Sequence, residues 1–350
     1  MTMRTPDRPL KIAVMSFAHT HARGYIELLR STPSISLLTS DPGEHSDTEL
    51  RGRTFAEHLG VDYVDSYDEL MAWQPDAVIV TSENARHRAD VERAAKAGAH
   101  ILCEKPLATS HEDGVAMLEA ADAAGVILMV AFPVRFASTF ARLKAEYDAG
   151  QLGQIFSVRG SNNGKLPSER AWFTDPELSG GGALVDHVVH IADLLEALMG
   201  AAPVSVTAVT NQKLHAERAR AETAGLVTIS YDNGVIAAID CSWSQPDTAA
   251  TWGGVSVTVA GTAGTVAVDF FGPRARGLDT ATGLPIEAPY GPNFDEALLS
   301  RFIDAVRTGT QPQPDGGVGL RTLDIGLAAQ ESARTGRTVA VADVARALVE

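Results

Sequence analysis

The sequence predicts an α/β protein of two domains: a doubly wound parallel sheet, followed by an α+β domain with a large open, mainly antiparallel sheet. At 350 residues the chain is longer than one ordinary domain. Its first 131 residues alternate short apolar runs with helix-period segments, and later apolar runs are joined by tight, glycine-containing turns. We therefore expect domains over 1–131 and 132–350, with C-terminal helices that can pack back on the first domain.

The composition restricts the class of protein. Apolar residues make up 45% and charged residues 21% of the chain, as in globular proteins. A net charge of −15 without a basic stripe argues against a nucleic-acid partner. Two cysteines, Cys103 and Cys241, fit a reducing compartment. No apolar leader precedes Lys11 and no run reaches the ~20 residues that span a bilayer, so we expect a cytoplasmic protein with no membrane partner.

Five apolar runs in the first domain are typical of buried parallel strands: 12–15, 35–39, 77–81, 100–103 and 126–131. Between them lie amphipathic stretches long enough for crossover helices, near 20–30, 46–59, 84–97 and 110–124, and a shorter pair around Tyr63 and 68–73. Gly98 and Gly125 suit helix ends, and Ser110 suits a helix start. Repeated units of this kind predict a parallel sheet with right-handed crossovers.

The pattern changes after Ala131. A helix is expected up to Ala149, and strand-like segments follow at 155–159, 204–210, 226–231, 235–241, 255–260 and 265–270. The turns 232–234 and 261–264 suit hairpins, which make neighbouring strands antiparallel. The segment 271–292 is rich in Gly and Pro, and helices are expected over 294–308 and 318–335 with a loop between them.

The first strand-to-helix turn is where a parallel sheet of this kind holds a pyrophosphate. The usual Gly-x-Gly-x-x-Gly is missing, because Ser16, Ala18 and His21 stand where the glycines would fall. Serine and alanine still permit fairly close backbone approach, whereas a histidine changes how the helix packs on the strand. We expect Ser16, Ala18, His19 and Thr20 to line a dinucleotide site.

Two further strand ends carry polar residues that suit a dinucleotide. Asp41 follows the second strand, where a carboxylate accepts hydrogen bonds from the adenosine ribose and repels a 2′-phosphate, so NAD is favoured while NADP stays open. A plain turn over 41–43 explains Asp41 equally well. Ser82, Asn84 and His87 follow the third run and suit the nicotinamide ribose, although Ser82 or Asn84 can also simply cap a helix.

The pair His19-x-His21 could suggest a metal site. Two histidines at i and i+2 do not share a helix face, and no carboxylate lies at ligand spacing. We therefore predict no metal, and we expect these histidines to line the cofactor turn.

Glu104-Lys105-Pro106 follows a buried strand directly. Charged residues at the carboxyl end of a parallel strand lie where open sheets of this kind bind ligands. Pro106 holds Lys105 in an extended conformation and can carry a cis peptide bond. A solvated turn is the alternative.

In the second domain the reactive side chains are concentrated in 180–193, where three glycines precede a helical segment. Asp186 and His190 are one turn apart, and Asp193 follows on a similar face. Histidine transfers protons near neutral pH, and a carboxylate can orient it or bind a hydroxyl. The flanking residues are apolar, which predicts that the pair is half-buried.

Several polar or aromatic residues near this helix could recognise substrate hydroxyls. We expect Asn162, Asn163, Lys165 and Trp172 on the loop before the glycines, with His187 beside them. For each, a loop hydrogen bond or a packed aromatic ring is an equal alternative.

Three stretches of the sequence resemble the Gfo/Idh/MocA family of nicotinamide-dependent oxidoreductases. They are 97–108, similar to the family's AG-x-HVL-x-EKP signature; 180–193, similar to its GGG…D-x-x-x-H-x-x-D; and the tail 319–337. The resemblance implies a Rossmann domain, then a domain whose open sheet often forms an oligomer interface. It also implies that Lys105, Asp186 and His190 form the catalytic group. The chain departs from the family pattern at the Ser16–His21 turn.

The expected reaction is reversible oxidation of a secondary alcohol on a sugar, cyclitol or related polyol, with NAD as cofactor. His190 would act as general base, Asp186 would orient the substrate, and Lys105 would stabilise charge on the reacting oxygen. Cofactor contacts are also expected from Glu104, Lys105 and Arg135, and substrate contacts from Asn163, Trp172, His187 and the catalytic group. We expect a homo-oligomer, a dimer or tetramer. The alternatives are a net non-redox reaction such as glycoside cleavage, and a non-catalytic sensor.

Overall fold

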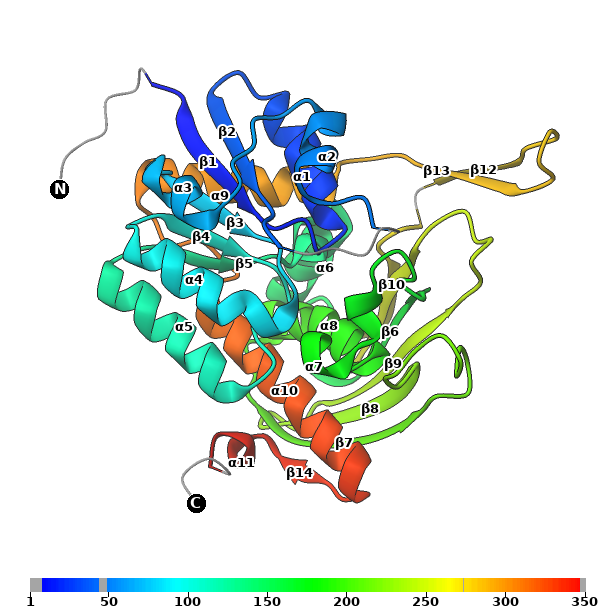
Figure 1. Ribbon diagram of the computed structural model, residues 1–350. Coiled ribbons are helices and arrows are strands. Elements are labelled where there is room, and N and C mark those ends of the chain that lie inside the picture. The colour runs from blue at the N-terminus through cyan, green and yellow to red at the C-terminus, as the bar shows by residue number, and fades with distance from the viewer. Residues whose placement is uncertain (1–7, 44–48, 273, 347–350) are drawn as a thin grey trace. The chain divides into compact units, whose positions relative to one another are not determined.

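The computed structural model describes residues 8–43, 49–272 and 274–346, and the chain divides into two compact units (Figure 1). The first unit comprises Met1–Ala131 and Asp295–Leu320, and the second comprises Phe132–Phe294 and Arg321–Glu350. The segment Asp295–Leu320 therefore belongs with the N-terminal part of the chain, while the residues after it return to the second unit.

The first unit is built on a five-stranded parallel sheet of order β2-β1-β3-β4-β5. Its strands are β1 (Leu10–Met15), β2 (Ile35–Ser40), β3 (Ala77–Val80), β4 (His100–Cys103) and β5 (Leu128–Val130). The helices are α1 (His21–Arg30), α2 (Gly52–Leu59), α3 (Tyr67–Ala72), the short η1 (Asn84–Arg86), α4 (His87–Lys96), α5 (His111–Ala124) and α9 (Phe294–Thr308). This is the predicted doubly wound Rossmann sheet, and the fold prediction is confirmed.

Local signals place the helix ends of this unit. Ser110 caps α5, because its hydroxyl accepts a hydrogen bond from the Asp113 N–H at 3.2 Å. Gly98 and Gly125 follow α4 and α5 with φ of 74° and 66°, a left-handed conformation that glycine adopts without strain. The helix predicted over 46–59 begins at Gly52, and positions 44–48 lie outside the described residues.

The second unit contains a seven-stranded sheet of order β11-β10-β6-β9-β8-β7-β14, in which the β6–β9 pair is parallel and the other pairs are antiparallel. Its strands are β6 (Ile155–Lys165), β7 (Pro203–Asn211), β8 (Ala224–Tyr231), β9 (Ile236–Gln245), β10 (Gly253–Gly261), β11 (Gly264–Asp269) and β14 (Val339–Ala340). The helices are η2 (Pro133–Phe136), α6 (Ser138–Asp148), η3 (Ala171–Thr174), α7 (Pro176–Ser179), α8 (Ala183–Met199), α10 (Gly316–Thr335, which begins in the first unit) and α11 (Val341–Arg346).

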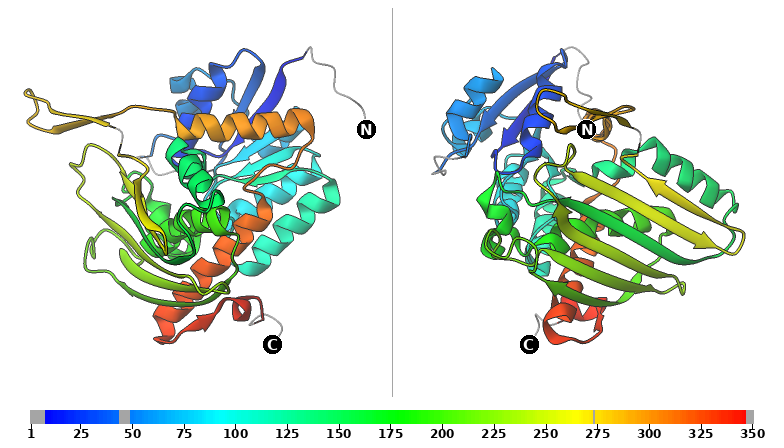
Figure 2. Two further views of the ribbon diagram at one scale, coloured as in Figure 1. Left: turned by 180° about the vertical axis from the view of Figure 1, so that it is seen from behind. Right: turned by 90° about the vertical axis from the view of Figure 1, so that its right-hand side faces the viewer.

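Helix α8 packs on one face of this sheet, and the opposite face is open in the right-hand view of Figure 2. Gly160 in the middle of β6 permits the close approach of α8, because a Cβ atom there would lie 2.7 Å from Cγ2 of Ile191. Close packing at Gly160 therefore fixes the middle of α8 against β6, and α8 also packs on β9.

Two parts of the second unit differ from the prediction. Strand β6 continues to Lys165, so Asn162, Asn163 and Lys165 lie on a central strand and not on a loop. Their polar sequence has low strand propensity, but pairing with β10 and β9 on both sides overrides it. The Gly- and Pro-rich segment after Phe271 contains a two-stranded sheet, β12 (Arg274–Leu278) with β13 (Pro285–Pro289).

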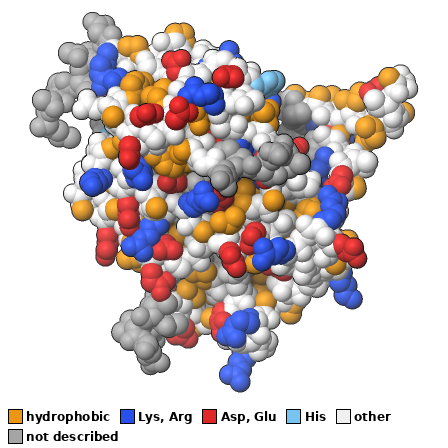
Figure 3. Space-filling model, in the orientation of Figure 1, with side chains coloured by type: hydrophobic (Ala, Val, Ile, Leu, Met, Phe, Trp, Pro, Cys, Tyr) orange, Lys and Arg blue, Asp and Glu red, His pale blue; other side chains and the backbone are white. Residues whose placement is uncertain are grey.

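Among the described residues, no helix combines the length and the apolar character required to cross a bilayer. On the surface shown in Figure 3, basic side chains are interspersed with acidic ones.

Candidate functional site

The turn between β1 and α1 contains no glycine and is held by its own hydrogen bonds. Ser16 has a φ of 75°, in the left-handed region, which for a non-glycine residue costs about 1–2 kcal/mol. Its hydroxyl accepts a hydrogen bond from the Ala18 N–H at 3.2 Å. The N–H of His19 donates to the Thr81 carbonyl at 2.9 Å, and that of His21 donates to Nδ1 of His19 at 3.2 Å. Several N–H groups of the turn are therefore already hydrogen-bonded, and these bonds stabilise its backbone conformation.

The same turn fits the pyrophosphate of a nicotinamide dinucleotide in other respects. Helix α1 begins at His21 and has no acidic residue in its first turn, so its N-terminus favours an anion. Ala18 is fully buried and contributes no bulk beyond its methyl group, and Thr20 precedes the helix. Backbone groups at this end of α1 would hold the phosphates, but the N–H groups of Ala18, His19 and His21 would first have to give up the hydrogen bonds that they make here.

Asp41 lies at the end of β2, as predicted, but its carboxylate is already saturated. Oδ1 accepts hydrogen bonds from Ser16 (3.1 Å) and from Nη2 of Arg51 (2.7 Å), and Oδ2 accepts from Nε of Arg51 (3.1 Å) and the Gly52 N–H (3.0 Å). A carboxylate offers about four acceptor positions, so a ribose diol would have to displace one of these donors.

Arg51 is the residue in this region that the sequence reasoning missed. Its side chain is 6% exposed, and Nη1 donates to Glu83 at 3.0 Å while Nη2 also contacts the Ser16 hydroxyl at 3.2 Å. A buried Asp41 requires a cationic partner, which is the signal that could have pointed to an arginine nearby. Burial would lower the pKa of Arg51, but hydrogen bonds and charge from Asp41 and Glu83 raise it well above its usual value.

The residues predicted near the nicotinamide ribose lie at the end of β3 and are buried. Ser82 and Asn84 are 1% and 5% exposed. His87 is the first residue of α4, and its ring nitrogens contact main-chain carbonyls: Nδ1 those of Pro106 (3.1 Å) and Leu107 (3.2 Å), and Nε2 that of Ser82 (3.2 Å). Burial lowers the pKa of His87. His87 therefore joins the β3 end to the segment after β4, and a cofactor contact through its nitrogens would cost one of these bonds.

Glu104 and Lys105 follow β4, and the Lys105–Pro106 peptide bond is cis. The Glu104 carboxylate is buried and accepts hydrogen bonds from Tyr25 Oη (2.7 Å), His21 Nδ1 (3.0 Å) and the Lys105 N–H (3.1 Å). Burial by itself would raise the pKa of Glu104, but the neighbouring histidines and Lys105 hold it well below its usual range. Lys105 is 5% exposed, so this segment is a packed structure and not a solvated turn.

Glu104 lies beside both histidines of the β1–α1 turn. Its Oε2 is 3.8 Å from Nε2 of His19, and its Oε1 bonds His21. Burial would lower the pKa of His21, but the Glu104 charge and hydrogen bond raise it. The fold thus supplies the carboxylate that the sequence spacing around the two histidines lacks.

In the second unit, α8 begins after three glycines and carries two of the three expected catalytic residues, Asp186 and His190. Gly180 and Gly181 have φ of 80° and 158°, and the Gly182 N–H donates to Oε1 of Glu222 at 2.8 Å. Between Ala183 and Leu195, all residues are buried except Asp186 and His190. The helix therefore presents two polar side chains, one turn apart, from an otherwise covered surface.

One residue of α8 and one of β9 hold the Asp186 carboxylate. Oδ2 lies 3.2 Å from Nε2 of His187 and 3.4 Å from Nε1 of Trp243, a fully buried residue that the sequence reasoning missed. His187 is itself fixed, because its Nδ1 donates to the Asn162 carbonyl at 2.8 Å. His190 packs its ring edge-on against Phe132, with centroids 6.0 Å apart.

Arg135 was predicted to contact the cofactor, but its guanidinium is held by Asp193. Nη2 lies 2.5 Å from Oδ1 and Nε 3.1 Å from Oδ2, and Asp193 is 1% exposed. Burial raises the pKa of Asp193 to about 7, against the effect of Arg135, which lowers it. Arg135 and Asp193 thus form an ion pair between η2 and α8, because a buried carboxylate needs a cationic partner, and the cofactor contact of Arg135 stays a prediction.

The remaining expected substrate residues are held by neighbours within the second unit. Asn163 donates from Nδ2 to the Ser242 hydroxyl at 2.7 Å, across the β6–β9 pair. Trp172 in η3 is 4% exposed and stacks on Phe173 with ring centroids 3.9 Å apart. Trp172 is therefore a packed aromatic residue and Asn163 makes a cross-strand hydrogen bond, while a substrate contact of either residue stays a prediction.

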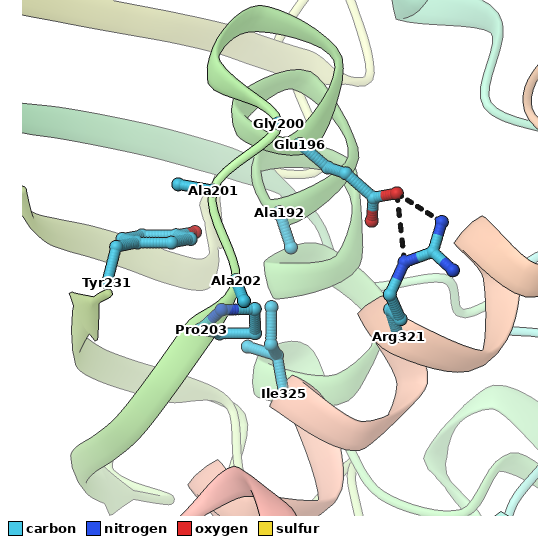
Figure 4. A pocket seen from close by; sticks show the side chains of 9 residues that line it. All are labelled: Ala192, Glu196, Gly200, Ala201, Ala202, Pro203, Tyr231, Arg321 and Ile325. Atoms are coloured by element: carbon cyan, nitrogen blue, oxygen red, sulfur yellow. Dashed lines mark hydrogen bonds and ion pairs between the residues drawn. The ribbon is translucent and has the colours of Figure 1, made fainter. Parts of the chain in front are cut away.

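A pocket of about 340 Å³ lies near the C-terminal end of α8 (Figure 4). One wall carries the ion pair of Glu196 with Arg321, and Tyr231 lies on another side. The expected site residues are not among its lining, which consists of Ala192, Glu196, Gly200, Ala201, Ala202, Pro203, Tyr231, Arg321 and Ile325.

Comparison with known proteins agrees with this architecture. Residues 16–132 match the family model described as "Oxidoreductase family, NAD-binding Rossmann fold". Residues 140–267 match the model of the GFO/IDH/MocA C-terminal domain. The two matches follow one another along most of the chain, in the order of the two sheets.

Relatives of known activity match over most of their length. D-xylose 1-dehydrogenase (NADP(+)) 2 of Haloferax volcanii is 30% identical over 307 residues, 84% of this chain and 90% of the relative. The scyllo-inositol 2-dehydrogenase (NAD(+)) of Bacillus subtilis is 29% identical over 330 residues, 89% of this chain and 93% of the relative.

A solved structure agrees with the fold. GenD2 from gentamicin A biosynthesis, determined in complex with NAD, has a TM-score of 0.83 and 24% identity, covering 97% of this chain and 98% of that one. Two family models match successive parts of the chain, and a relative matches 84% of it at 30% identity. The protein therefore belongs to the Gfo/Idh/MocA family of NAD(P)-dependent oxidoreductases.

Proposed function

We propose that this oxidoreductase acts on a secondary alcohol of a sugar, cyclitol or related polyol, with His190 as general acid and base. The observation that carries the proposal is the surface of α8, where Asp186 and His190 alone emerge between Ala183 and Leu195. A histidine and a carboxylate one helical turn apart suit proton transfer to and from a hydroxyl. The xylose and inositol dehydrogenases among the relatives support the substrate class.

Each member of the proposed catalytic group has a separate task. His190 takes the hydroxyl proton while the carbinol C–H bond breaks. The nicotinamide, when bound, supplies the hydride acceptor. Lys105 donates a hydrogen bond to the reacting oxygen and stabilises the negative charge that develops there. Asp186, held by His187 and Trp243, binds and orients a substrate hydroxyl.

We further propose that NAD is preferred over NADP. The Arg51 guanidinium lies between Asp41 and Glu83, and Glu49 is 3.9 Å from its Nη1. Three carboxylates against two guanidiniums, since Arg86 also lies 3.5 Å from Glu83, leave a net negative charge, which opposes a 2′-phosphate. This preference depends on the whole cluster and not on a free Asp41.

The test is a panel of sugars and inositols with NAD and with NADP, followed by the absorbance of the reduced nicotinamide. We expect at least one panel member to give reduced cofactor in a one-to-one ratio with oxidised product, with a higher kcat/KM for NAD. A member that is converted without net reduced cofactor would instead indicate a net non-redox reaction. No conversion of any polyol, under conditions where calorimetry shows NAD binding, would contradict the proposed substrate class.

A further inference from the structure

The two histidines of the β1–α1 turn and the carboxylate that follows β4 form a compact cluster inside the first unit. One ring nitrogen each from His19 and His21 and one oxygen of Glu104 all lie within 4.8 Å of one another. We propose that this cluster, the His19–His21–Glu104 site, binds a divalent transition-metal ion, with Zn²⁺ as the first candidate. Two imidazoles and one carboxylate are a donor set that such ions favour.

The distances are close to those of a coordinated ion. Tetrahedral ligands at about 2.0–2.1 Å from Zn²⁺ are roughly 3.4 Å apart. In this structure Nδ1 of His21 is 3.0 Å from Oε1 of Glu104, and Nε2 of His19 is 3.8 Å from Oε2. These two distances involve different oxygens of Glu104, and the three ligand atoms lie within 4.8 Å of one another, so the side chains must close by up to about 1.4 Å to form three bonds, with a fourth position left for water or another ligand.

Groups outside the three ligands hold the Glu104 carboxylate in place. Tyr25, which is fully buried, donates its hydroxyl to Oε1 at 2.7 Å, and the Lys105 N–H donates to Oε2 at 3.1 Å. Outer-shell donors of this kind orient a ligating carboxylate and contribute strongly to affinity. The Glu104 carboxylate is therefore already oriented for metal binding.

The ring proton of His19 must move before an ion can bind to this histidine. Nδ1 of His19 accepts the His21 N–H in this structure, so coordination through Nε2 requires the ring proton on Nδ1 and loses that contact. The nearby charges of Glu104 and Asp295 favour a cation, while Lys105 opposes one. An ion bound here would link the β1–α1 turn to the segment after β4 that carries Lys105. The proposal does not depend on the polyol substrate, because it concerns metal binding alone.

The experiment is titration of the metal-free full-length protein with Zn²⁺, followed by calorimetry and native mass spectrometry, and with Co²⁺, followed by its visible absorption. We expect one bound ion per chain. Glu104→Gln, which keeps an acceptor for Tyr25, and His21→Ala should each weaken binding by at least about 10-fold. His58→Ala, an exposed histidine of α2 in the same unit, is the matched control and should bind as the unmodified protein does.

Two results would overturn the proposal. One is the absence of a bound ion in the native mass spectrum of the unmodified protein, a measurement that needs no variant and so cannot fail through misfolding. The other is unchanged affinity in folded Glu104→Gln and His21→Ala, with folding checked by circular dichroism, because the ion would then be bound elsewhere.

Discussion

Arg51 connects three segments of the first unit through charges that are almost fully covered. It contacts Asp41 after β2, Glu83 after β3 and Ser16 in the β1–α1 turn. Because these groups are buried, each charge is stabilised by its partners. Without a partner, the desolvation of a buried charge is not offset by any attraction. The cluster therefore sets both the shape of the turn and the local charge.

Arg51→Ala is expected to lower the free energy of unfolding by roughly 3–5 kcal/mol, since it leaves the buried Asp41 without its guanidinium and Glu83 with Arg86 alone. Urea titration followed by circular dichroism measures this change. The matched control is Arg53→Ala, whose ion pair with Asp65 is about half exposed or more and should therefore contribute much less to stability. Equal losses in the two variants would contradict the role assigned to Arg51.

Asp90 gives a prediction on pH. It is 6% exposed on α4, and burial raises its pKa from 3.8 to about 6. Between these two values the native state holds a proton that the unfolded state lacks, so stability falls as the pH rises. From pH 5 to pH 8 this group should remove about 1.4 kcal/mol.

Asp90→Asn should abolish that part of the pH dependence. Urea titrations of the unmodified protein and the variant at pH 5 and pH 8 give the difference directly, and other titrating groups cancel in the comparison. If the gap between the two proteins is the same at both pH values, Asp90 has an ordinary pKa and the prediction is wrong.

At the scale of elements, the position of α8 depends on Gly160 in β6. An added methyl group would lie 2.7 Å from Cγ2 of Ile191 on α8, so the helix or the strand would have to shift. We expect Gly160→Ala to cost about 1–3 kcal/mol of stability and to lower activity, because Asp186 and His190 are on the same helix.

Gly254→Ala in β10 is the matched control, since a Cβ atom there meets nothing within 4 Å. Thermal unfolding and kcat/KM measured on both variants test the claim. Equal behaviour of the two variants would mean that α8 does not depend on the close approach at Gly160.

Elements whose signals are local could be predicted, and contacts between distant segments could not. Ser110, Gly98 and Gly125 mark helix ends through their own conformational preferences. The apolar strands of the first sheet were likewise found from their own residues. By contrast, the polar end of β6 is a strand only because β10 and β9 pair with it, which no local pattern encodes.

The candidate site shows the same division. Lys105, Asp186 and His190 were singled out by motif and spacing, and their roles remain predictions. The bond of His21 to Glu104 joins residues 83 positions apart, and no periodicity connects them. The Asp193 partner of Arg135 and the Trp243 partner of Asp186 are also distant in sequence. Such pairings follow from the topology of the fold. Their one sign in the sequence is a charged residue in a segment expected to be buried, because a buried charge needs a partner.

At the scale of the whole molecule, the open face of the second sheet is the expected surface for self-association. Leu226 on β8, its cross-strand neighbour Val209 on β7, and Ile236 on β9 are 58%, 63% and 52% exposed. Apolar residues paired on an uncovered sheet favour burial against a second copy. We expect a dimer or tetramer in solution.

Leu226→Asp should shift the protein toward the monomer, because it places a charge in the expected contact. Light scattering after size exclusion measures the mass of the unmodified protein and the variant. Leu50→Asp, an exposed leucine of the first unit, is the control and should leave the mass unchanged. A monomeric unmodified protein, or a variant that stays associated, would contradict this assignment of the sheet face.

The central claim is that His190 transfers the substrate proton in a nicotinamide-dependent oxidation. The most direct measurement is steady-state kcat for reduced-cofactor formation by His190→Ala, with a polyol that the unmodified protein turns over and with His58→Ala as control. We predict a loss of about 10²- to 10⁴-fold in His190→Ala and none in the control. Turnover by folded His190→Ala equal to that of the unmodified protein would contradict the account.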